Sequence, residues 1–372
     1  MMTILHIFVD DKFSKGIFGR YLDDGRTKNT CALINLKNDV LHYLSGYDGL
    51  SILTSRKEVK QFFQTTTYDV VFLHSFPVKS WFAIQYIPHD KKIVWWAWGY
   101  DIYQLPYGIK PFIKVEQYKP ITKRLLKRIS LHCIKELFQY PLFPYYSLLR
   151  NKVLERIDYF QPVIPLEYKL MKLNKGFNAE EFYYPNSLAF RNLICENVLD
   201  HQGNILFGNS AHYTNNHLDV AEYMKKATFD NQIVFIPVSY GVPQYKDRLK
   251  KHLQISGVKL TFMEGFLPLV EYYSMVNSCS YFVSGVIRQQ SMGNIYYCLL
   301  NGIKVFLYKD SLVYKQLISD NCFVYAIEDI EDNSFSKPLT KEEAEHNRAC
   351  VLNDAKRRDE IWNCFLMQNN NQ

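Results

Sequence analysis

The chain has 372 residues, of which 48% are hydrophobic and 22% charged, and this length and composition suit a folded protein of two domains. Its eight cysteines form neither a CxxC pair nor a zinc-like Cys/His cluster, and no apolar run approaches the roughly 18 residues that span a bilayer. These features argue against a disulfide framework, a zinc site and a transmembrane protein, and they predict a cytoplasmic location. The net charge of +7 arises in residues 110–156, where eleven Lys and Arg residues outnumber three Glu.

Short apolar runs separated by helix-compatible stretches mark the first half of the chain. The run at 4–9 is predicted to be a first strand, because it is short and lacks the basic leader of a signal peptide. Similar runs follow at 50–54, 69–74 and 92–96. Strands that alternate with helices indicate a parallel sheet covered by helices on both faces.

Residues 110–156 interrupt this rhythm. Residues 121–129 predict a helix with leucine and isoleucine on one side and bases on the other, and an aromatic, proline-rich stretch follows at 138–146. Such a composition is typical of a helix that lies on an anionic membrane surface. A solvated basic helix and a nucleic-acid patch are the alternatives, but no nucleic-acid-binding motif accompanies the segment. The expected membrane-binding residues are Lys123, Arg124, Lys127 and Arg128.

The second half shows the α/β alternation more clearly. After a polar linker at 196–203, strands are predicted at 205–207, 233–237, 258–262, 280–284 and 304–308, with a helix after each of the first four. This pattern predicts a second doubly wound domain. We therefore expect domains over 1–195 and 196–367, and we consider a return of the last helix to the first domain.

One loop of the second half leads from a predicted strand towards a helix, at the edge where parallel sheets bind ligands. It begins with Gly208, Asn209 and Ser210 and runs towards Asn215, Asn216 and His217. A glycine at the end of a strand lets the backbone approach a ligand, and a helix N-terminus suits a phosphate group. The alternative is an ordinary helix cap, for which Ser and Asn are preferred residues.

A second loop, at 286–294, follows the strand predicted at 280–284. Arg288 can neutralise a diphosphate through a forked contact, and Ser291, Gly293 and Asn294 open the next helix. The alternative is a solvated arginine beside a helix cap.

A third loop, at 95–103, lies in the first half. Trp98 and Gly99 come at the end of a strand, where a sugar would stack on the indole and Asp101 would accept a hydroxyl proton. Asp11 follows the first strand of the same sheet and is the second candidate base. His74 follows the strand at 70–73 and is the third, although a lone histidine is more often structural.

Several chemistries have no motif in this sequence. The GxSxG, GxxxxGK[ST] and HExxH patterns are missing, and so is a clean DxD motif of metal-dependent sugar transferases. We therefore expect no bound metal.

Three segments are similar to motifs of one known family. The segment at 95–105 (WWAWGYDIYQL) is similar to WxxWGxDxYxL, 206–217 (LFGNSAHYTNNH) to LxGNSxxxxNxH, and 288–293 (RQQSMG) to RQQxxG. Together, in this order, they resemble the TDP-N-acetylfucosamine:lipid II N-acetylfucosaminyltransferase family of enterobacterial common antigen assembly, also described as 4-alpha-L-fucosyltransferases. Weaker similarities lie at His74, at 237–240, and at Glu264 with 271–272.

The resemblance implies a GT-B architecture, in which two Rossmann-like doubly wound domains face a central cleft. Residues 1–195 would bind the acceptor on the side of Trp98, Gly99, Asp101 and His74, and residues 196–367 would bind the nucleotide sugar. The implied donor carries a dTDP-linked 4-acetamido-4,6-dideoxy sugar, and the implied acceptor is a lipid-linked saccharide. The expected donor-binding residues are Gly208, Asn209, Ser210, Asn215, His217, Ser239, Tyr240, Glu264, Arg288, Gln289, Gln290 and Gly293.

The expected function is that of a metal-independent glycosyltransferase without a cofactor or a nucleic-acid partner, peripheral on the inner face of the bacterial plasma membrane. It would move a sugar such as 4-acetamido-4,6-dideoxygalactose or fucose during surface-polysaccharide synthesis. Arg288 would stabilise the departing diphosphate. If the anomeric centre inverts, Asp101 would act as the base, with Asp11 as the second choice; a retaining transfer stays open as the alternative. Ala211-His212-Tyr213 and Ser284-Gly285-Val286 depart from the family pattern. A GDP- or UDP-sugar donor therefore stays open as an alternative. A non-catalytic, membrane-bound assembly partner is the alternative from another class of function.

Overall fold

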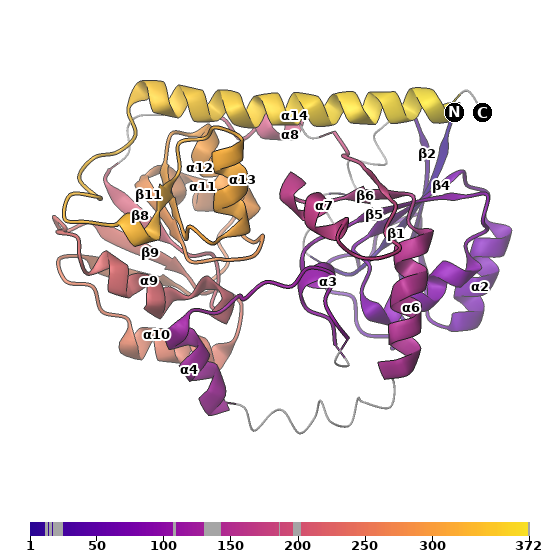
Figure 1. Cartoon of the computed structure of the whole chain (residues 1–372), viewed down its shortest axis with the longest axis horizontal. Coiled ribbons are helices and arrows are strands. Elements are labelled where there is room, and N and C mark those ends of the chain that lie inside the picture. Colours follow the sequence, from indigo (N-terminus) through magenta and orange to yellow (C-terminus); the bar gives the residue numbers. More distant parts are fainter. Residues whose placement is uncertain are drawn as a thin grey trace. The chain divides into compact units, whose positions relative to one another are not determined.

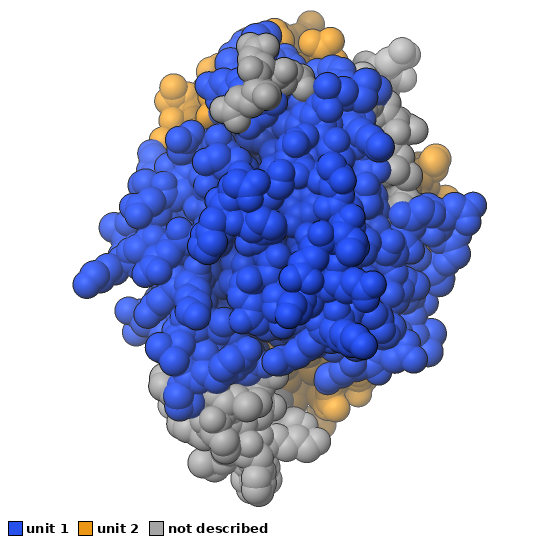
Figure 2. Space-filling model, turned by 90° about the vertical axis from the view of Figure 1, so that its right-hand side faces the viewer, with its two compact units in different colours: residues 1–114, 133–184, 358–372 blue, residues 115–132, 185–357 orange. Residues whose placement is uncertain are grey.

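The computed structural model describes residues 1–11, 14, 17, 25–106, 109–129, 143–185, 187–195 and 202–370. Two compact units make up the chain, and each is built on its own parallel sheet (Figure 1). Unit 1 comprises Met1–Lys114, Cys133–Tyr184 and Arg358–Gln372, and unit 2 comprises Val115–His132 and Pro185–Arg357, coloured blue and orange in Figure 2. The predicted pair of doubly wound α/β domains is confirmed.

In the described part of unit 1, the sheet has seven strands in the order β3-β2-β1-β4-β5-β6-β7, all paired in parallel. They are β1 (Thr3–Phe8), β2 (Lys28–Ile34), β3 (Leu50–Leu53), β4 (Val70–His74), β5 (Lys92–Trp96), β6 (Tyr159–Gln161) and β7 (Glu180–Glu181). The central strands β1, β4 and β5 are nearly continuous buried runs, because helices cover both faces. The chain order reverses between β1 and β4, and such sheets bind ligands at the carboxyl ends of that pair.

The described helices of unit 1 each contribute buried residues to that unit or connect its strands. They are α2 (Arg56–Thr65), η1 (Val78–Tyr86), α3 (Tyr100–Tyr103), α6 (Phe143–Arg156), α7 (Pro165–Met171) and the end of α14 (Lys341–Asn370). Ser55 caps the N-terminus of α2, because its hydroxyl accepts from the backbone N–H of Glu58, and the helix buries Val59 and Phe63. The end of α14 places Trp362 and Phe365 in the core of unit 1.

In the described part of unit 2, the sheet has six parallel strands in the order β10-β9-β8-β11-β12-β13. They are β8 (Asn204–Phe207), β9 (Ile233–Pro237), β10 (Lys259–Met263), β11 (Cys279–Ser284), β12 (Lys304–Leu307) and β13 (Tyr325–Ala326). The chain order reverses between β8 and β11, so these two strands flank the expected ligand-binding point.

The helices of unit 2 lie on both sides of its sheet, with α9 and α10 on one side and α12 and α13 on the other (Figure 1). They are α9 (His217–Met224), α10 (Pro243–His252), α11 (Leu269–Asn277), α12 (Met292–Leu300) and α13 (Leu312–Ser319), with the short α8 (Ser187–Arg191), η4 (Tyr213–Asn215) and η5 (Ile327–Asp329).

The basic helix α4 (Pro120–Ile129) belongs to unit 2, whereas we expected all of residues 110–156 in the first domain. The reason is that its apolar side chains Ile121, Leu125 and Leu126 pack against the core of unit 2. Ile121 and Leu125 line a groove together with Leu218 and Ala221 of α9.

Basic side chains of α4 remain outside this packing. Lys123 is half-exposed and pairs with Glu116 at 3.2 Å, and Arg124 is exposed. The side chains of Lys127 and Arg128, and residues 130–142, lie outside the described part of the chain. Among the described helices, none combines the length and apolar character needed to cross a membrane.

Candidate functional site

Three loops of unit 2 meet at the carboxyl ends of adjacent strands. We call them the β8 loop (208–216), the β9 loop (238–242) and the β11 loop (285–291). Backbone hydrogen bonds join the first two, from Ala211 N to Tyr240 O at 2.8 Å and from Val242 N to Ala211 O at 2.7 Å. The loops predicted from sequence therefore lie at the β8–β11 switch point, where a doubly wound sheet binds its ligand.

Side-chain amides connect all three loops. Asn209 Nδ2 donates to the hydroxyl of Tyr240 at 3.1 Å, and Gln290 Nε2 donates to Asn209 Oδ1 at 3.2 Å. Thr214 Oγ1 donates to Gln290 Oε1 at 2.7 Å. Asn209, Thr214 and Gln290 therefore form one polar network across the mouth of the switch point.

Two glycines allow this close approach of loops. Gly208 has a φ of +71°, which disfavours a side chain, and a Cβ there would overlap Nε2 of His217. A Cβ at Gly285 would overlap the carbonyl oxygen of Asn215 and lie 2.6 Å from Cγ2 of Val220. The β8 and β11 loops can meet only because no side chain separates them here.

Hydrogen bonds of buried polar residues hold the conformation of the β8 loop. Asn215 Oδ1 accepts from the backbone N–H of Asn209 at 3.2 Å, and its Nδ2 donates to the carbonyl oxygen of Ser210 at 3.1 Å. His217 is fully buried and lies 3.3 Å from the hydroxyl of Tyr245 through Nδ1. Burial lowers the pKa of His217 to about 3, so it is neutral at physiological pH. Ser210, Asn215 and His217 therefore shape the loop rather than form its exposed surface.

Arg288 places a positive charge beside the β8 loop. Its Nε donates to Gln117 Oε1 at 3.0 Å and its Nη1 to the carbonyl oxygen of Gln289 at 2.8 Å. Burial, and then the charge of Arg288, lowers the pKa of His212 in the β8 loop. The guanidinium charge therefore reaches the loop that the sequence predicts to hold phosphate.

Three polar atoms near the end of β11 find no hydrogen-bond partner among the described residues. They are Oγ of Ser284, Oε1 of Gln289 and Oγ of Ser291. Ser284 is completely buried, Gln289 is 7% exposed, and Ser291 precedes the first turn of α12. Buried polar atoms without a protein partner are typical of positions that a ligand or water satisfies.

The remaining expected donor residues occupy more open positions. Ser239 is half-buried, and Tyr240 is 38% exposed with its ring parallel to that of Phe266. Glu264 forms ion pairs with Lys246, at 3.4 Å, and with Lys250. Gly293 is exposed in the first turn of α12. The loop network therefore includes Tyr240, while Glu264 is held in a separate surface cluster.

In unit 1, Asp101 differs from our expectation. Its Oδ2 accepts from the backbone N–H of Phe76 at 3.0 Å and from Trp95 Nε1 at 2.8 Å, and its Oδ1 accepts from the backbone N–H of Trp98 at 2.9 Å. The residue is 1% exposed. Burial raises the pKa of Asp101, and these hydrogen bonds act in the opposite direction. A carboxylate so enclosed holds the 97–99 loop in shape, so the structure does not favour Asp101 as the general base.

His74 also lies in the core rather than at an open edge. Its Nε2 is 2.9 Å from His6 Nδ1, and its ring stacks on Phe8 with centroids 4.2 Å apart. Burial lowers the pKa of His74 well below its usual value, with a further contribution from His6. Direct contact with an acceptor is therefore not supported for His74.

Trp98 and Asp11 have more accessible positions at the carboxyl ends of β5 and β1, whereas Gly99 is buried. Trp98 is half-buried beside the core, and Gly99 caps α3. Asp11, which follows β1, is half-buried. Burial raises the pKa of Tyr100, and the negative charges of Asp101 and Asp11 raise it further. Asp11 is thus the candidate carboxylate that stays at least partly accessible beside the 98–100 loop.

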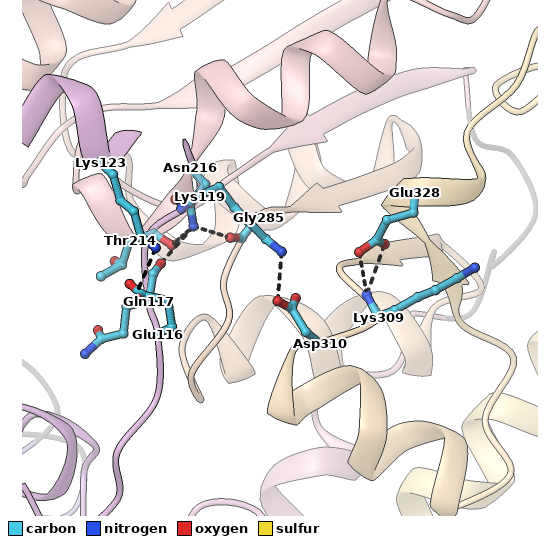
Figure 3. A network of polar contacts seen from close by, with 10 residues as sticks. All are labelled: Glu116, Gln117, Lys119, Lys123, Thr214, Asn216, Gly285, Lys309, Asp310 and Glu328. Carbon is cyan, nitrogen blue, oxygen red and sulfur yellow. Dashed lines mark hydrogen bonds and ion pairs between the residues drawn. The ribbon is translucent and has the colours of Figure 1, made fainter. Parts of the chain in front are cut away.

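Two residues of the site had no role assigned from the sequence. Asn216 is fully buried, and its Nδ2 donates to the carbonyl oxygen of Gly285 at 2.7 Å (Figure 3). It lies inside the NNH motif, so the motif itself was the available signal. Gln117, the partner of Arg288, lies outside every motif we identified. Among the described residues, no group of three His, Cys, Asp or Glu side chains gathers as a metal site requires.

The chain is similar in sequence to one protein family. The family described as 4-alpha-L-fucosyltransferase, glycosyl transferase group 56, matches residues 138–341. No curated protein sequence matches the chain.

Solved structures resemble the whole chain at very low sequence identity. One is alpha,alpha-trehalose 6-phosphate synthase from Burkholderia multivorans, with a TM-score of 0.59 and 8% identity over 100% of this chain and 96% of that one. A second is sucrose-phosphate synthase from Thermosynechococcus elongatus, with a TM-score of 0.56 and 10% identity over 99% of this chain and 97% of that one. A third is WaaG, a glycosyltransferase involved in lipopolysaccharide biosynthesis, with a TM-score of 0.51 and 11% identity over 96% of this chain and 95% of that one. At such identity the likeness shows the fold alone, which is GT-B.

Proposed function

The chain belongs to the 4-alpha-L-fucosyltransferase family, glycosyl transferase group 56, and from this premise we propose that it transfers a deoxy or acetamido-deoxy sugar from a nucleotide donor to a lipid-linked saccharide. Membership makes it a glycosyltransferase. We propose a sugar such as 4-acetamido-4,6-dideoxygalactose or fucose, a dTDP-linked donor, and a role in bacterial surface-polysaccharide synthesis.

The observation that carries the proposal is the loop network at the β8–β11 switch point of unit 2. The β8 loop, the β9 loop and the β11 loop are tied together by Asn209 and Gln290, and Arg288 adds a positive charge. Backbone N–H groups before a helix and a nearby guanidinium are what a diphosphate requires. This supports donor binding in unit 2 without a metal, with Arg288 and the start of α12 stabilising the charge of the departing nucleoside diphosphate.

We assign the proton transfer to Asp11. In the transfer, the acceptor hydroxyl oxygen bonds to the anomeric carbon as the bond to the diphosphate breaks, and a carboxylate takes the hydroxyl proton. Asp101 is buried and hydrogen bonds occupy both of its oxygens, whereas Asp11 is only half-buried, and on this ground we prefer Asp11 as the base. Asp11→Asn is expected to lower turnover about a hundredfold or more without changing donor affinity. An unchanged turnover would remove Asp11 from this role.

We propose that the protein docks on an anionic membrane surface through the cationic side of α4, at the inner face of the plasma membrane. The support is that Lys123 and Arg124 lie outside the packing of α4 on α9, so docking is electrostatic rather than by insertion. Replacing Lys123, Arg124, Lys127 and Arg128 with Glu is expected to abolish binding to anionic vesicles. The control replaces four other lysines of unit 2, namely Lys225, Lys226, Lys250 and Lys251. Equal losses in both variants would contradict a docking role for α4.

A thermal-shift panel of dTDP, UDP, GDP and CMP tests the proposed donor site. A ligand that binds only the folded protein raises its melting temperature. We expect one nucleotide to stabilise the wild-type protein and to lose this effect in Arg288→Ala. Selective stabilisation by GDP or UDP would replace dTDP as the donor base, and no stabilisation by any nucleotide would favour a non-catalytic assembly partner.

A further inference from the structure

A segment that leaves unit 1 is anchored on the donor loops of unit 2. We call residues 115–129 the arm; it contains α4. Nδ2 of the buried Asn216 donates to the carbonyl oxygen of Gln117 at 3.1 Å and to that of Gly285 at 2.7 Å, and its Oδ1 accepts from the backbone N–H of Lys119 at 2.9 Å (Figure 3). One amide therefore fixes the arm against the β11 loop.

Further contacts hold the arm on both sides of this point. The carboxylate of Asp219 accepts from the backbone N–H groups of Ile121, at 2.7 Å, and Thr122, at 2.9 Å. Lys119 Nζ lies 2.8 Å from the carboxylate of Asp310 (Figure 3). It also lies 4.3 Å from the centre of the Tyr308 ring. The backbone around residue 117 is therefore held at several points rather than by a single contact.

The Gln117 side chain determines how Arg288 lies. Its Oε1 accepts from Arg288 Nε at 3.0 Å, while the carbonyl oxygen of Gln289 accepts from Nη1 at 2.8 Å. A guanidinium is planar, so two hydrogen bonds from different nitrogens define its orientation. Gln117 is 6% exposed, which protects its bond to Arg288 from competition by water.

The chemistry of this acceptor matters for an anionic ligand. A carboxylate at position 117 would bind Arg288 more strongly but would also neutralise it and repel a diphosphate. The neutral amide of Gln117 orients the guanidinium without neutralising its charge. The lowered pKa of His212, to which Arg288 contributes after burial, is consistent with a charge that reaches this loop.

We propose that Gln117 is a positioning residue for the donor diphosphate: it orients Arg288 across the switch point from a segment outside the family motifs. This inference rests on the proposed donor site in unit 2. It makes the arm, whose helix α4 carries exposed bases, a structural part of the nucleotide site.

The test measures calorimetric affinity of the full-length protein for a nucleoside diphosphate and for the corresponding nucleoside. Gln117→Met removes the acceptor while keeping the length of the side chain. It is expected to lower affinity for the diphosphate about tenfold, the usual effect of losing one hydrogen bond to a charged group, and to leave nucleoside affinity unchanged. Gln117→Asn, which shortens the side chain by one methylene, is the second variant and is expected to show the same selective loss.

Two comparisons separate positioning from general loosening. Lys119→Met breaks an anchor of the arm without touching Arg288, and it is expected to change diphosphate affinity less than about twofold. In an Arg288→Lys background, Gln117→Met is expected to have no further effect, because the two residues act through one contact. Equal losses in Gln117→Met and Lys119→Met, or additive effects of Gln117 and Arg288, would overturn the inference. No diphosphate binding by the wild-type protein would overturn the proposed function itself.

Discussion

The carboxyl ends of the two sheets use similar polar residues in different ways. In unit 1, Asp101 and His74 are buried, and the groups they bond, such as Trp95 and His6, belong to the same core. In unit 2, Asn209 and Gln290 are only partly buried and bond across separate loops. A polar residue at the end of a strand is thus a good ligand candidate only when folding leaves it at the surface between loops. The two edges should therefore respond in opposite ways to mutation.

The largest effect is expected for Asp101→Ala. The change removes the acceptor for two backbone N–H groups and one indole N–H inside unit 1. Leaving these donors unpaired should lower the free energy of unfolding by about 3–5 kcal/mol. Urea unfolding followed by tryptophan fluorescence measures this, because all five tryptophans of the chain belong to unit 1.

Asp90→Ala is the matched control for Asp101→Ala. The side chain of Asp90 is 72% exposed and pairs with Lys91 at 3.4 Å, so its loss should change the unfolding free energy by less than about 0.5 kcal/mol. Nucleotide binding should be normal in both variants. An Asp101→Ala protein of normal stability but without turnover would restore Asp101 as the general base.

A second buried carboxyl group of unit 1 should make its stability depend on pH. Burial raises the pKa of Glu167 to about 7, against the opposing hydrogen bonds from Tyr103, Ile164 and Val163. Because this pKa is higher in the folded than in the unfolded state, the folded state binds the proton more tightly between about pH 4.5 and 7. Stability from this group is present at low pH and is lost as pH rises through that window, by up to about 3 kcal/mol.

Glu167→Gln isolates this contribution, because Gln cannot titrate but offers an oxygen to the same backbone donors. The difference in unfolding free energy between the variant and the wild type should change by about 3 kcal/mol in favour of the variant from pH 5 to pH 8. Buried His217 in unit 2, with its pKa of about 3, has the opposite sign, since its contribution is lost as pH falls from 6.5. It titrates equally in both proteins and cancels. A pH-independent difference would show that Glu167 stays charged.

The fold was predictable because buried strands and amphipathic helices leave periodic patterns in the sequence. The apolar runs at 4–9 and 280–284 proved to be central strands of their sheets. The fate of individual polar groups was not predictable in this way. Nothing local shows that Phe76 N and the Trp95 indole converge on Asp101, because this depends on how β4 and β5 pair.

The position of the arm was not predictable from the sequence either. The sequence shows that residues 121–129 are amphipathic, but not which surface their apolar face covers. That surface is α9, nearly one hundred residues later, and its Asp219 accepts from the start of α4. Gln117 carries no motif, because its role depends on a contact with Arg288 that only the folded chain creates.

A smaller effect is expected for Gly285→Ala in unit 2. The new Cβ would overlap the backbone of Asn215, which cannot move without shifting the β8 loop. We expect a loss of about 2 kcal/mol in unfolding free energy, typical of overpacking, together with weaker nucleotide binding. The control is Gly265→Ala, where a Cβ meets nothing within 4 Å. Normal nucleotide affinity in Gly285→Ala would separate the β11 loop from the donor site.

The smallest effect on stability is expected for Asn209→Ala, which is the counterpart of Asp101→Ala at the other edge. Asn209 is partly exposed, so water can satisfy Tyr240 and Gln290 after its loss, and the unfolding free energy should fall by no more than about 1 kcal/mol. Nucleoside diphosphate affinity should nevertheless fall about tenfold, because the Asn209 amide links the β8 loop to the β9 loop through Tyr240 and to the β11 loop through Gln290. Tyr240→Phe, which removes only one acceptor of that amide, should lose less affinity. Asn209→Ala could instead destabilise the fold as much as Asp101→Ala and bind the nucleoside diphosphate normally. That result would show that the polar residues at the β8–β11 switch point are structural, like those of unit 1.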